Sequence, residues 1–454
     1  MKHGAPRRKA RQALVSELSR RVHGLQSYPM SRGPRLRRWL AWLAGLGSTF
    51  LIAAAAWALT VRNQDISNPN VEFKNQPDRP PAPEPRRHGK REPSFEWPVY
   101  GYDKQRTREF PLRDPSSLHP PYNHMWSDRG SVLIEFPPVL GRRALFMLKN
   151  NGALYALSRR TGHLLWKKKV GSLAAASPAY AHNTVYAVVL QRFKGSDGGR
   201  IIALDAENGR VRWARKLPSR AESSPLIDHG RVYFGSEDGT VYSLNARDGT
   251  LRWMFHAAGA VKAGLAMDNH RNLYFGSYGG EVYSVRARDG SRRWSTSGGG
   301  NFYSTPAVAY DRVYLGSTDG NVYSFGAATG RLAWRHGTGG YVYGSPAVAK
   351  VPRGRPTVYI GSYDNKLYAL DARTGRPRWT RSAEGKISGG TVVIGDLVFY
   401  STLARTTTAV GARTGRFVWR TRKGAFNPVV SDGHRLFLMG YSSVFALKPK
   451  KRRS

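Results

Sequence analysis

Hydrophobic and polar residues alternate in short runs along most of this chain, and the runs come in pairs joined by glycine turns. Tyr368 to Trp379, YALDARTGRPRW, is the clearest example. Its Tyr-x-Leu-x alternation is typical of a half-buried strand. The Thr-Gly pair that follows is a hairpin signal, because glycine adopts a positive φ without steric cost. The segment therefore predicts two antiparallel strands, the second of which contains a tryptophan.

This pattern recurs at a spacing of about 40 residues. Each copy has a small residue, then a glycine six positions on, then a tryptophan four positions further. The tryptophans that belong to the pattern are Trp166, Trp213, Trp253, Trp294, Trp334, Trp379 and Trp419. The glycines are Gly162, Gly209, Gly249, Gly290, Gly330, Gly375 and Gly415. In most copies a second hairpin and a short apolar strand come first, so each unit predicts four strands.

Units of four short strands at this spacing bury both faces of each sheet by stacking radially, as the blades of a β-propeller. Trp126 fits the period one step before Trp166, and three more strand patterns follow Trp419. The chain then ends where the last hairpin and tryptophan should come. We therefore predict an all-β domain of eight four-stranded blades over residues 121–449. Pairing of Tyr122 to Gly130 with the C-terminal strands would close the eighth blade and remove both exposed edges. We expect this propeller to be a monomer.

The docking pattern is Ala-x-Asp-x-x-x-Gly-x-x-x-Trp, and Ala203, Gly209 and Trp213 match it well. It resembles the tryptophan-docking motif of PQQ-like (quinoprotein-type) repeats, and the domain is most similar to BamB-like scaffold propellers. The resemblance implies that each tryptophan packs between the glycine of its own blade and the small residue of the next. It also implies that Ala446 receives Trp126 across the closure.

A BamB-like propeller implies a noncatalytic scaffold that binds envelope or membrane proteins or peptides during assembly. Two alternatives stay open, a PQQ-dependent quinoprotein oxidoreductase and a ligand-sensing ectodomain. The first implies PQQ with a calcium ion, but no pair of carboxylates in the sequence identifies itself as a site. The chain also has no cysteine, so it lacks both a vicinal cysteine pair and the cysteine lipid anchor of BamB. We expect no catalytic residue, cofactor or metal site, and we leave open whether the protein is an enzyme.

The residues before the propeller differ in composition from it. They divide into a basic tail (1–38), an uncharged apolar run (39–61), a charged, proline-rich linker (62–94) and an aromatic lead-in (95–120), while 450–454 form a second basic tail. At about 1.5 Å per residue, the apolar run is long enough to cross a membrane as a helix. Positive charge on its N-terminal side predicts a cytoplasmic N-terminus and an exported propeller. The alternative is a signal peptide cleaved near Ala56-Trp57-Ala58.

Charge and aromatic residues suggest where partners bind. The formal net charge is +42; export argues against nucleic acid and favours anionic surfaces such as lipid headgroups, wall polymers or acidic proteins. Two similar segments, 299–306 and 339–346, lead into innermost strands, which line the channel of a propeller. We therefore predict an aromatic rim of Phe302, Tyr303, Tyr341 and Tyr343 that could bind a peptide or ligand; packing at a hairpin edge is the alternative. In the lead-in, we prefer a structural plug to a binding role for Tyr100, Tyr102 and Asp103.

Overall fold

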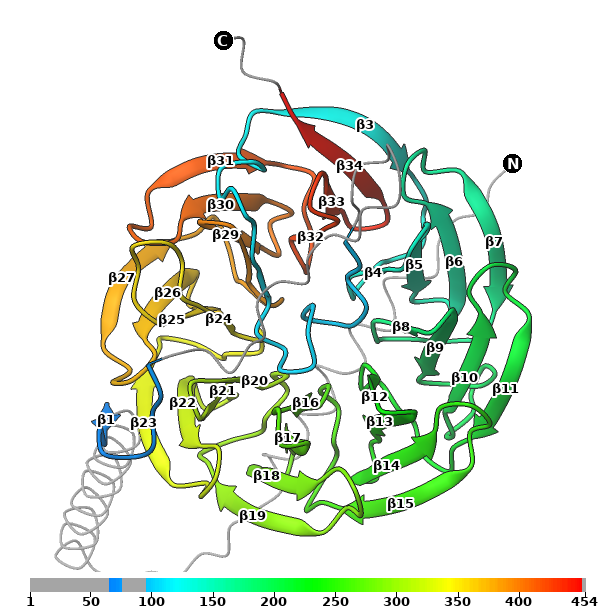
Figure 1. The fold of residues 1–454 in the computed structure, drawn as a ribbon, viewed down its shortest axis with the longest axis horizontal. Helices are drawn as coiled ribbons and strands as arrows, with labels where there is room; N and C mark the ends of the chain where they lie inside the picture. Colours follow the sequence, from blue (N-terminus) through cyan, green and yellow to red (C-terminus); the bar gives the residue numbers. More distant parts are fainter. Residues whose placement is uncertain (1–64, 76–94, 451–454) are drawn as a thin grey trace, which may run out of the picture. The chain divides into compact units, whose positions relative to one another are not determined.

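The computed structural model describes residues 65–75 and 95–450, which lie in one compact unit, Asn63–Ser454. Eight sheets are arranged as a ring around a central channel (Figure 1). The predicted eight-bladed, all-β propeller is thereby confirmed. The predicted transmembrane helix, 39–61, falls outside the described residues. Within 65–75 and 95–450, no helix is both long and apolar enough to span a bilayer.

Within each of the first seven blades, the four strands follow chain order from the innermost to the outermost. Blades 1 to 4 are β4 (Val139–Leu140), β5 (Ala144–Lys149), β6 (Ala153–Ser158) and β7 (Leu164–Lys169); β8 (Ala179–Ala181), β9 (Thr184–Val189), β10 (Arg200–Asp205) and β11 (Val211–Lys216); β12 (Leu226–Asp228), β13 (Arg231–Gly235), β14 (Thr240–Asn245) and β15 (Leu251–His256); and β16 (Ala266–Met267), β17 (Asn272–Gly276), β18 (Glu281–Arg286) and β19 (Arg292–Ser297). Blades 5 to 7 are β20 (Ala307–Ala309), β21 (Arg312–Gly316), β22 (Asn321–Gly326) and β23 (Leu332–Gly337); β24 (Ala347–Ala349), β25 (Thr357–Gly361), β26 (Lys366–Asp371) and β27 (Pro377–Ser382); and β28 (Val392–Ile394), β29 (Leu397–Ser401), β30 (Thr407–Gly411) and β31 (Phe417–Thr421).

Burial differs between the strands of one blade, as radial packing requires. In blade 3, nearly all of β14 is buried, because neighbouring blades cover both of its faces. The outer strand β15 is largely exposed, and Trp253 is its one fully buried residue. Apolar residues thus continue along the middle strands but occur singly along the outer ones. The core is a series of layers between blades rather than one central cluster.

Each docking tryptophan packs on the glycine of the next blade, which corrects the order that the resemblance implied. Trp166 of blade 1 lies against Gly209 of blade 2, where a Cβ atom would come within 2.8 Å of the indole ring. Gly209 has a φ of 71°, so it both permits the turn and leaves room for the ring. Within a blade, the small residue and the tryptophan are cross-strand partners, as Ala203 and Trp213 are. They cannot therefore belong to different blades.

The same contact joins seven blade pairs. The pairs are Trp126–Gly162, Trp166–Gly209, Trp213–Gly249, Trp253–Gly290, Trp294–Gly330, Trp334–Gly375 and Trp379–Gly415. In each pair the indole N–H also donates to a backbone carbonyl of the next blade, as Trp253 does to Ala287 at 3.0 Å. Trp419 has no such glycine, because blade 8 lacks the corresponding turn. Its ring instead meets the edge of Tyr122 at 5.1 Å.

Blade 8 closes the ring with strands from both ends of the domain. It consists of β32 (Val429–Ser431), β33 (Leu436–Met439), β34 (Val444–Pro449) and β3 (Tyr122–Asp128). The outer strand β3 pairs antiparallel with β34, and Trp126 lies opposite Ala446. The predicted closure between the two ends of the domain is thus confirmed.

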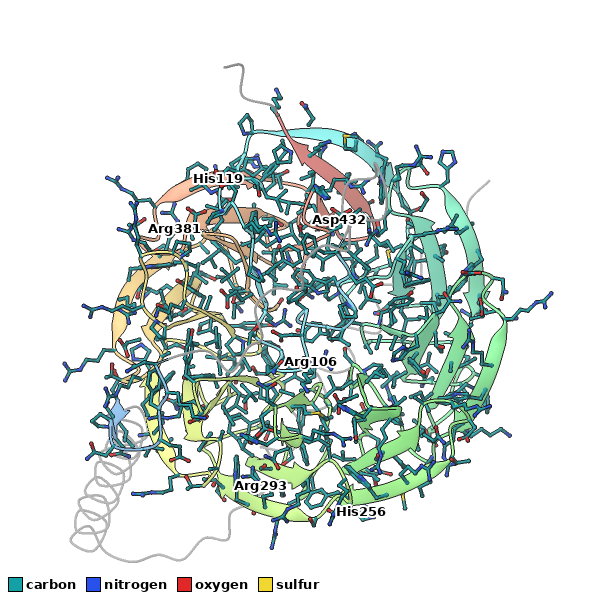
Figure 2. The ribbon with its side chains drawn as sticks, in the orientation of Figure 1. Arg106, His119, His256, Arg293, Arg381 and Asp432 are labelled. Atoms are coloured by element: carbon teal, nitrogen blue, oxygen red, sulfur yellow. The ribbon has the colours of Figure 1, made fainter. Side chains whose placement is uncertain are left out.

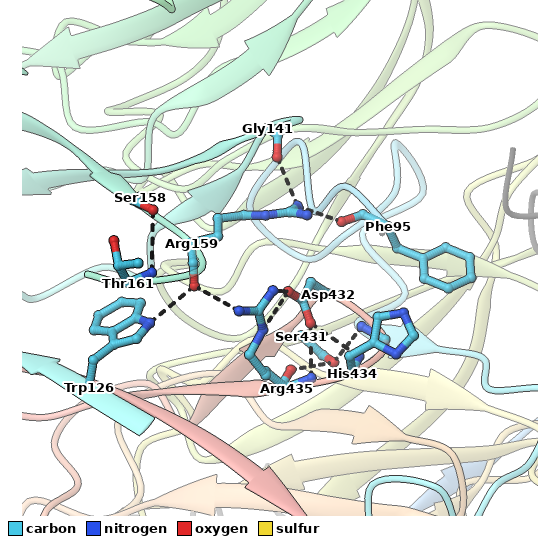
Figure 3. A network of polar contacts seen from close by, with 11 residues as sticks. Phe95, Trp126, Gly141, Ser158, Arg159, Thr161, Ser431, Asp432, His434 and Arg435 are labelled. Atoms are coloured by element: carbon cyan, nitrogen blue, oxygen red, sulfur yellow. Dashed lines mark hydrogen bonds and ion pairs between the residues drawn. The ribbon is translucent and has the colours of Figure 1, made fainter. Parts of the chain in front are cut away.

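A buried polar network spans the seam between blade 8 and blade 1 (Figure 3). The backbone carbonyl of Arg159 accepts hydrogen bonds from Trp126 Nε1 at 3.1 Å and from Arg435 Nη1 at 3.2 Å. Its guanidinium donates to the carbonyl of Gly141 at 2.8 Å. Arg435 in turn forms an ion pair of 2.8 Å with the fully buried Asp432. These contacts fix blade 1 to the last blade of the chain.

Two further strands add to the ring. β2 (Glu109–Phe110) pairs in parallel with the innermost strand of blade 7, and β1 (Ile66–Ser67) pairs with β23 at the outer edge of blade 5. Residues 65–75 therefore dock on the propeller, which differs from the free linker expected for 62–94. Asp65 contacts His336 at 2.9 Å, and Phe73 stacks on Tyr310 at 5.6 Å.

Candidate functional site

Residues 95–110 pass through the channel and contact all eight blades; we call this segment the plug. Its backbone pairs with Asp432 in blade 8, Leu140 in blade 1, Tyr180 in blade 2, Met267 in blade 4, Val308 in blade 5, Val348 in blade 6 and Val393 in blade 7, at 2.7–3.2 Å. Blade 3 is reached by the side chain of Arg106, which donates to the carbonyl of Pro225 at 3.1 Å. The lead-in thus occupies the channel as an integral part of the fold.

Arg106 lies at the centre of the ring (Figure 2) and is fully buried. Its Nε donates to the carbonyl of Leu265 at 2.8 Å, and Nη1 donates to the carbonyl of Tyr100. Burial, followed by the nearby charge of Arg108, lowers the pKa of Arg106 to about 9. Because backbone carbonyls occupy its donors, Arg106 holds the plug in place and does not present its charge to a ligand.

Tyr100 and Arg108 fill the channel on the side of the loops that lead into the innermost strands. The Arg108 guanidinium lies 3.9 Å from the centre of the Tyr100 ring. The Tyr100 hydroxyl is 3.2 Å from that of Ser345, just before β24. Gly390 leaves the space for Arg108, since a Cβ atom there would come within 2.4 Å of the guanidinium carbon. Burial lowers the pKa of Arg108. These contacts block the axis of the channel.

Five tyrosines gather at the channel mouth beyond Tyr100, and we call them the tyrosine cluster. They are Tyr278, Tyr303, Tyr341, Tyr343 and Tyr363, with ring centres 6.1 Å (278–303), 5.9 Å (303–343), 5.8 Å (341–343) and 5.0 Å (343–363) apart. Tyr303, Tyr341 and Tyr343 come from loops that lead into innermost strands. The other two come from the turns between second and third strands. Both kinds of connection lie on the same face, because successive strands are antiparallel.

The predicted rim residues do not all reach this mouth. Tyr303, Tyr341 and Tyr343 lie together, and Tyr341 is 53% exposed. Phe302 is fully buried in the layer between blades 4 and 5, next to Val313. Residues 302 and 303 are consecutive, so one turns into the core while the other faces the channel.

Sequence reasoning missed Tyr278 and Tyr363, although a signal was present. They follow Gly-Ser in turns where blades 3 and 5 carry Glu237 and Thr318. An aromatic residue at a turn position that other repeats fill with a polar one indicates a surface contact rather than a core contact. Burial raises the pKa of Tyr278 to about 12, so its hydroxyl stays protonated at neutral pH.

Acidic side chains lie beside the tyrosines. Glu222, just before β12, is buried and pairs with Lys262 at 2.9 Å. Glu135, just before β4, accepts a hydrogen bond from Asn150 at 3.2 Å. Burial, followed by the charge of Glu222, raises the pKa of Glu135. Burial, followed by the charges of both glutamates, raises the pKa of Tyr303. The mouth therefore combines aromatic rings with carboxylates in a protein of high positive charge.

We tested whether the mouth fits the calcium ion that accompanies PQQ in quinoproteins. Calcium prefers six to eight oxygen ligands, several of them carboxylates. No three or more histidine, aspartate or glutamate side chains in 65–75 and 95–450 are grouped to hold a metal ion. Tyr100 and Arg108 also occupy the axis. The side chains at this channel do not match the ligand set of such an ion.

Comparison with known proteins gives a family and a fold. The family model described as outer membrane protein assembly factor BamB matches residues 125–192, 150–262 and 253–453. Together these matches cover most of the chain. A search of curated proteins returned no match.

Three solved structures illustrate the similarity in fold. BamB from Moraxella catarrhalis is 18% identical, with a TM-score of 0.60 over 74% of this chain and 100% of that one. A quinohemoprotein alcohol dehydrogenase from Pseudomonas putida is 15% identical, with a TM-score of 0.63 over 79% of this chain and 82% of that one. A europium-containing methanol dehydrogenase is 15% identical, with a TM-score of 0.60 over 76% of this chain and 88% of that one. At these identities the likeness shows the fold alone.

Proposed function

The chain belongs to the family described as outer membrane protein assembly factor BamB, and from this premise we propose that it is a noncatalytic, membrane-anchored scaffold that binds envelope proteins. The observation that carries the proposal is the arrangement of the channel. The plug fills it through contacts with all eight blades, and the tyrosine cluster is left at the mouth. Tyrosine supplies a large contact area with little loss of side-chain entropy, which favours protein binding.

Anchoring and export are part of the proposal. They rest on the uncharged run 39–61 and on the basic residues that precede it. The expected topology places the N-terminus in the cytoplasm and the propeller outside it. Protease added to intact spheroplasts should then degrade the propeller, whereas full protection would contradict the orientation.

Site-specific photocrosslinking tests the scaffold function. A photoreactive phenylalanine at Tyr341, 53% exposed, should give a discrete adduct with an envelope protein in intact cells. The matched control position is Arg288, whose side chain is 84% exposed in a turn on the opposite face of the ring. Tyr343→Ala should weaken the Tyr341 adduct. Equal adducts from both positions, or none from Tyr341, would contradict the proposal.

The structural likeness to quinoproteins makes one competing function worth an experiment. Calorimetric titration of the propeller with pyrroloquinoline quinone and calcium should show no stoichiometric binding. Tight binding at one site per chain would replace the scaffold function with an oxidoreductase. This test is independent of the crosslinking result.

A further inference from the structure

Glu135 is held at the seam between blades 1 and 8 by two asparagines. Asn150, in the turn between β5 and β6, donates to its carboxylate at 3.2 Å. Asn427, just before β32, donates to its backbone carbonyl at 3.0 Å. Asn427 is only 6% exposed, while Glu135 is partly exposed. The carboxylate is therefore fixed in position and still reachable from the mouth.

The acceptors around Glu135 outnumber the donors. The side-chain oxygens of Asn150 and Asn427 are both buried, and neither has a hydrogen-bond partner among the described residues. No lysine, arginine or histidine of the described residues forms an ion pair with Glu135. The two nearest candidates are engaged elsewhere: Lys149 pairs with Asp128 at 3.1 Å, and Lys262 pairs with Glu222. Buried polar atoms without partners call for a missing ligand or water.

The aromatic wall beside these acceptors already receives cations elsewhere. Lys262 lies 5.2 Å from the ring centre of Tyr278, and Lys386 lies 5.4 Å from that of Tyr363. Such positions over an aromatic face stabilise a cation through the ring quadrupole. Tyr303 is close enough to Glu135 for the carboxylate to affect its titration. No described lysine or arginine lies over the Tyr303 ring.

We propose that Glu135, the side-chain oxygens of Asn150 and Asn427, and the ring of Tyr303 bind an organic cation, the ammonium or guanidinium of a lysine or arginine side chain of the partner protein. A single unpaired carboxylate beside an aromatic ring matches an organic cation better than a metal ion, which needs more charged oxygen ligands. This inference rests on the proposed scaffold function and specifies the chemistry of the partner. It also gives a strongly basic protein one acidic point at which a basic side chain is accepted.

Calorimetric titration of the unit 63–454 with three blocked amino acids tests the site. This unit has its own closed ring and layered core. N-acetyl-lysinamide and N-acetyl-argininamide should bind saturably, and neutral N-acetyl-norleucinamide should not. Glu135→Gln should weaken binding by about tenfold or more, because a hydrogen-bonded charge partner is lost. The matched control is Glu384→Gln, which removes an exposed carboxylate paired with Arg420 and should leave binding unchanged.

Two substitutions of Tyr303 separate the role of the ring from damage to the fold. Tyr303→Phe keeps the ring and should retain binding, whereas Tyr303→Leu should abolish it at equal thermal stability. Equal binding of norleucinamide, or unchanged affinity in Glu135→Gln, would overturn the inference. The Tyr341 adduct in cells should then persist in Glu135→Gln if the scaffold function itself is correct, and should be absent if that function is wrong.

Discussion

Trp334 of blade 5 is completely buried against Gly375 of blade 6, and its indole N–H donates to the carbonyl of Ala372 at 2.9 Å. Removing a buried aromatic side chain leaves a cavity as well as losing its burial. Trp334→Ala should therefore lower the free energy of unfolding by about 3–5 kcal/mol. Trp419→Ala is the control, since Trp419 has no glycine to dock on and is partly exposed. Denaturant titration should show a clearly smaller loss there; equal losses would contradict the docking argument.

The glycine side of this contact can be tested separately. Gly375 has a φ of 75°, and a Cβ atom there would approach the Trp334 ring to 2.7 Å. Gly230 has a φ of 71° but no atom within 4 Å of such a Cβ. Gly230→Ala should cost about 1 kcal/mol from backbone conformation alone. Gly375→Ala should cost more in thermal or denaturant unfolding. Similar costs would mean that the indole moves aside freely.

Ring closure predicts a strong effect of a small deletion. Removing residues 122–128 takes away β3, so that the edge of β34 and the dock on Gly162 are both lost. The shortened domain should unfold at a markedly lower temperature and should associate through its open edge. Removing 451–454 should change neither property. Calorimetry and size-exclusion chromatography measure the two effects, and an unchanged unfolding temperature would exclude the closure.

The plug predicts an effect of one buried cation. Arg106→Met keeps a long side chain but leaves the carbonyls of Leu265, Pro225 and Tyr100 without that donor. Each buried acceptor left unsatisfied costs about 1–3 kcal/mol, so unfolding free energy should fall by several kcal/mol. The exposed Arg247→Met is the control and should be close to neutral. A small effect of Arg106→Met would mean that the plug does not depend on this residue.

Glu135 predicts a gain of stability at neutral pH. Its pKa is raised above the ordinary value of 4.5 by burial and then by Glu222. The folded state therefore binds the proton more tightly, and stability falls as pH rises from 4.5 through the raised pKa. Glu135→Gln removes this loss, so the variant should be as stable as the parent, or more so, at pH 7. Below pH 4.5 its advantage should disappear. Denaturant titration across this range measures the difference, and a variant less stable at pH 7 would contradict it.

The repeated units were predictable because their signal is local. Strand alternation, a glycine turn and Trp253 or Trp379 occur within twelve residues, and the spacing of the tryptophans determines the number of blades. The direction of docking was not predictable in this way. It depends on which blade an indole faces, and that follows from the cross-strand pairing of Ala203 with Trp213 rather than from sequence spacing.

The channel was harder to predict for a different reason. The plug contacts the blades mainly through its backbone, and backbone hydrogen bonds leave no side-chain pattern. Tyr102, Arg106 and Arg108 adopt positive φ values of 79°, 59° and 54°, which their residue types do not favour. The asparagines and Glu135 meet only because the first and last blades are neighbours. Such a site has no signature within any one repeat.

The plug also constrains how the domain is made. Residues 95–110 leave the ribosome before every blade, and all eight blades later pack around them. Assembly therefore proceeds outward from a strand of chain that is already present, rather than by threading a segment into a finished ring. The last partner of β3 is β34, which ends at Pro449. A nascent chain therefore has to be kept from aggregating until nearly its whole length is available, and any early termination yields an open ring.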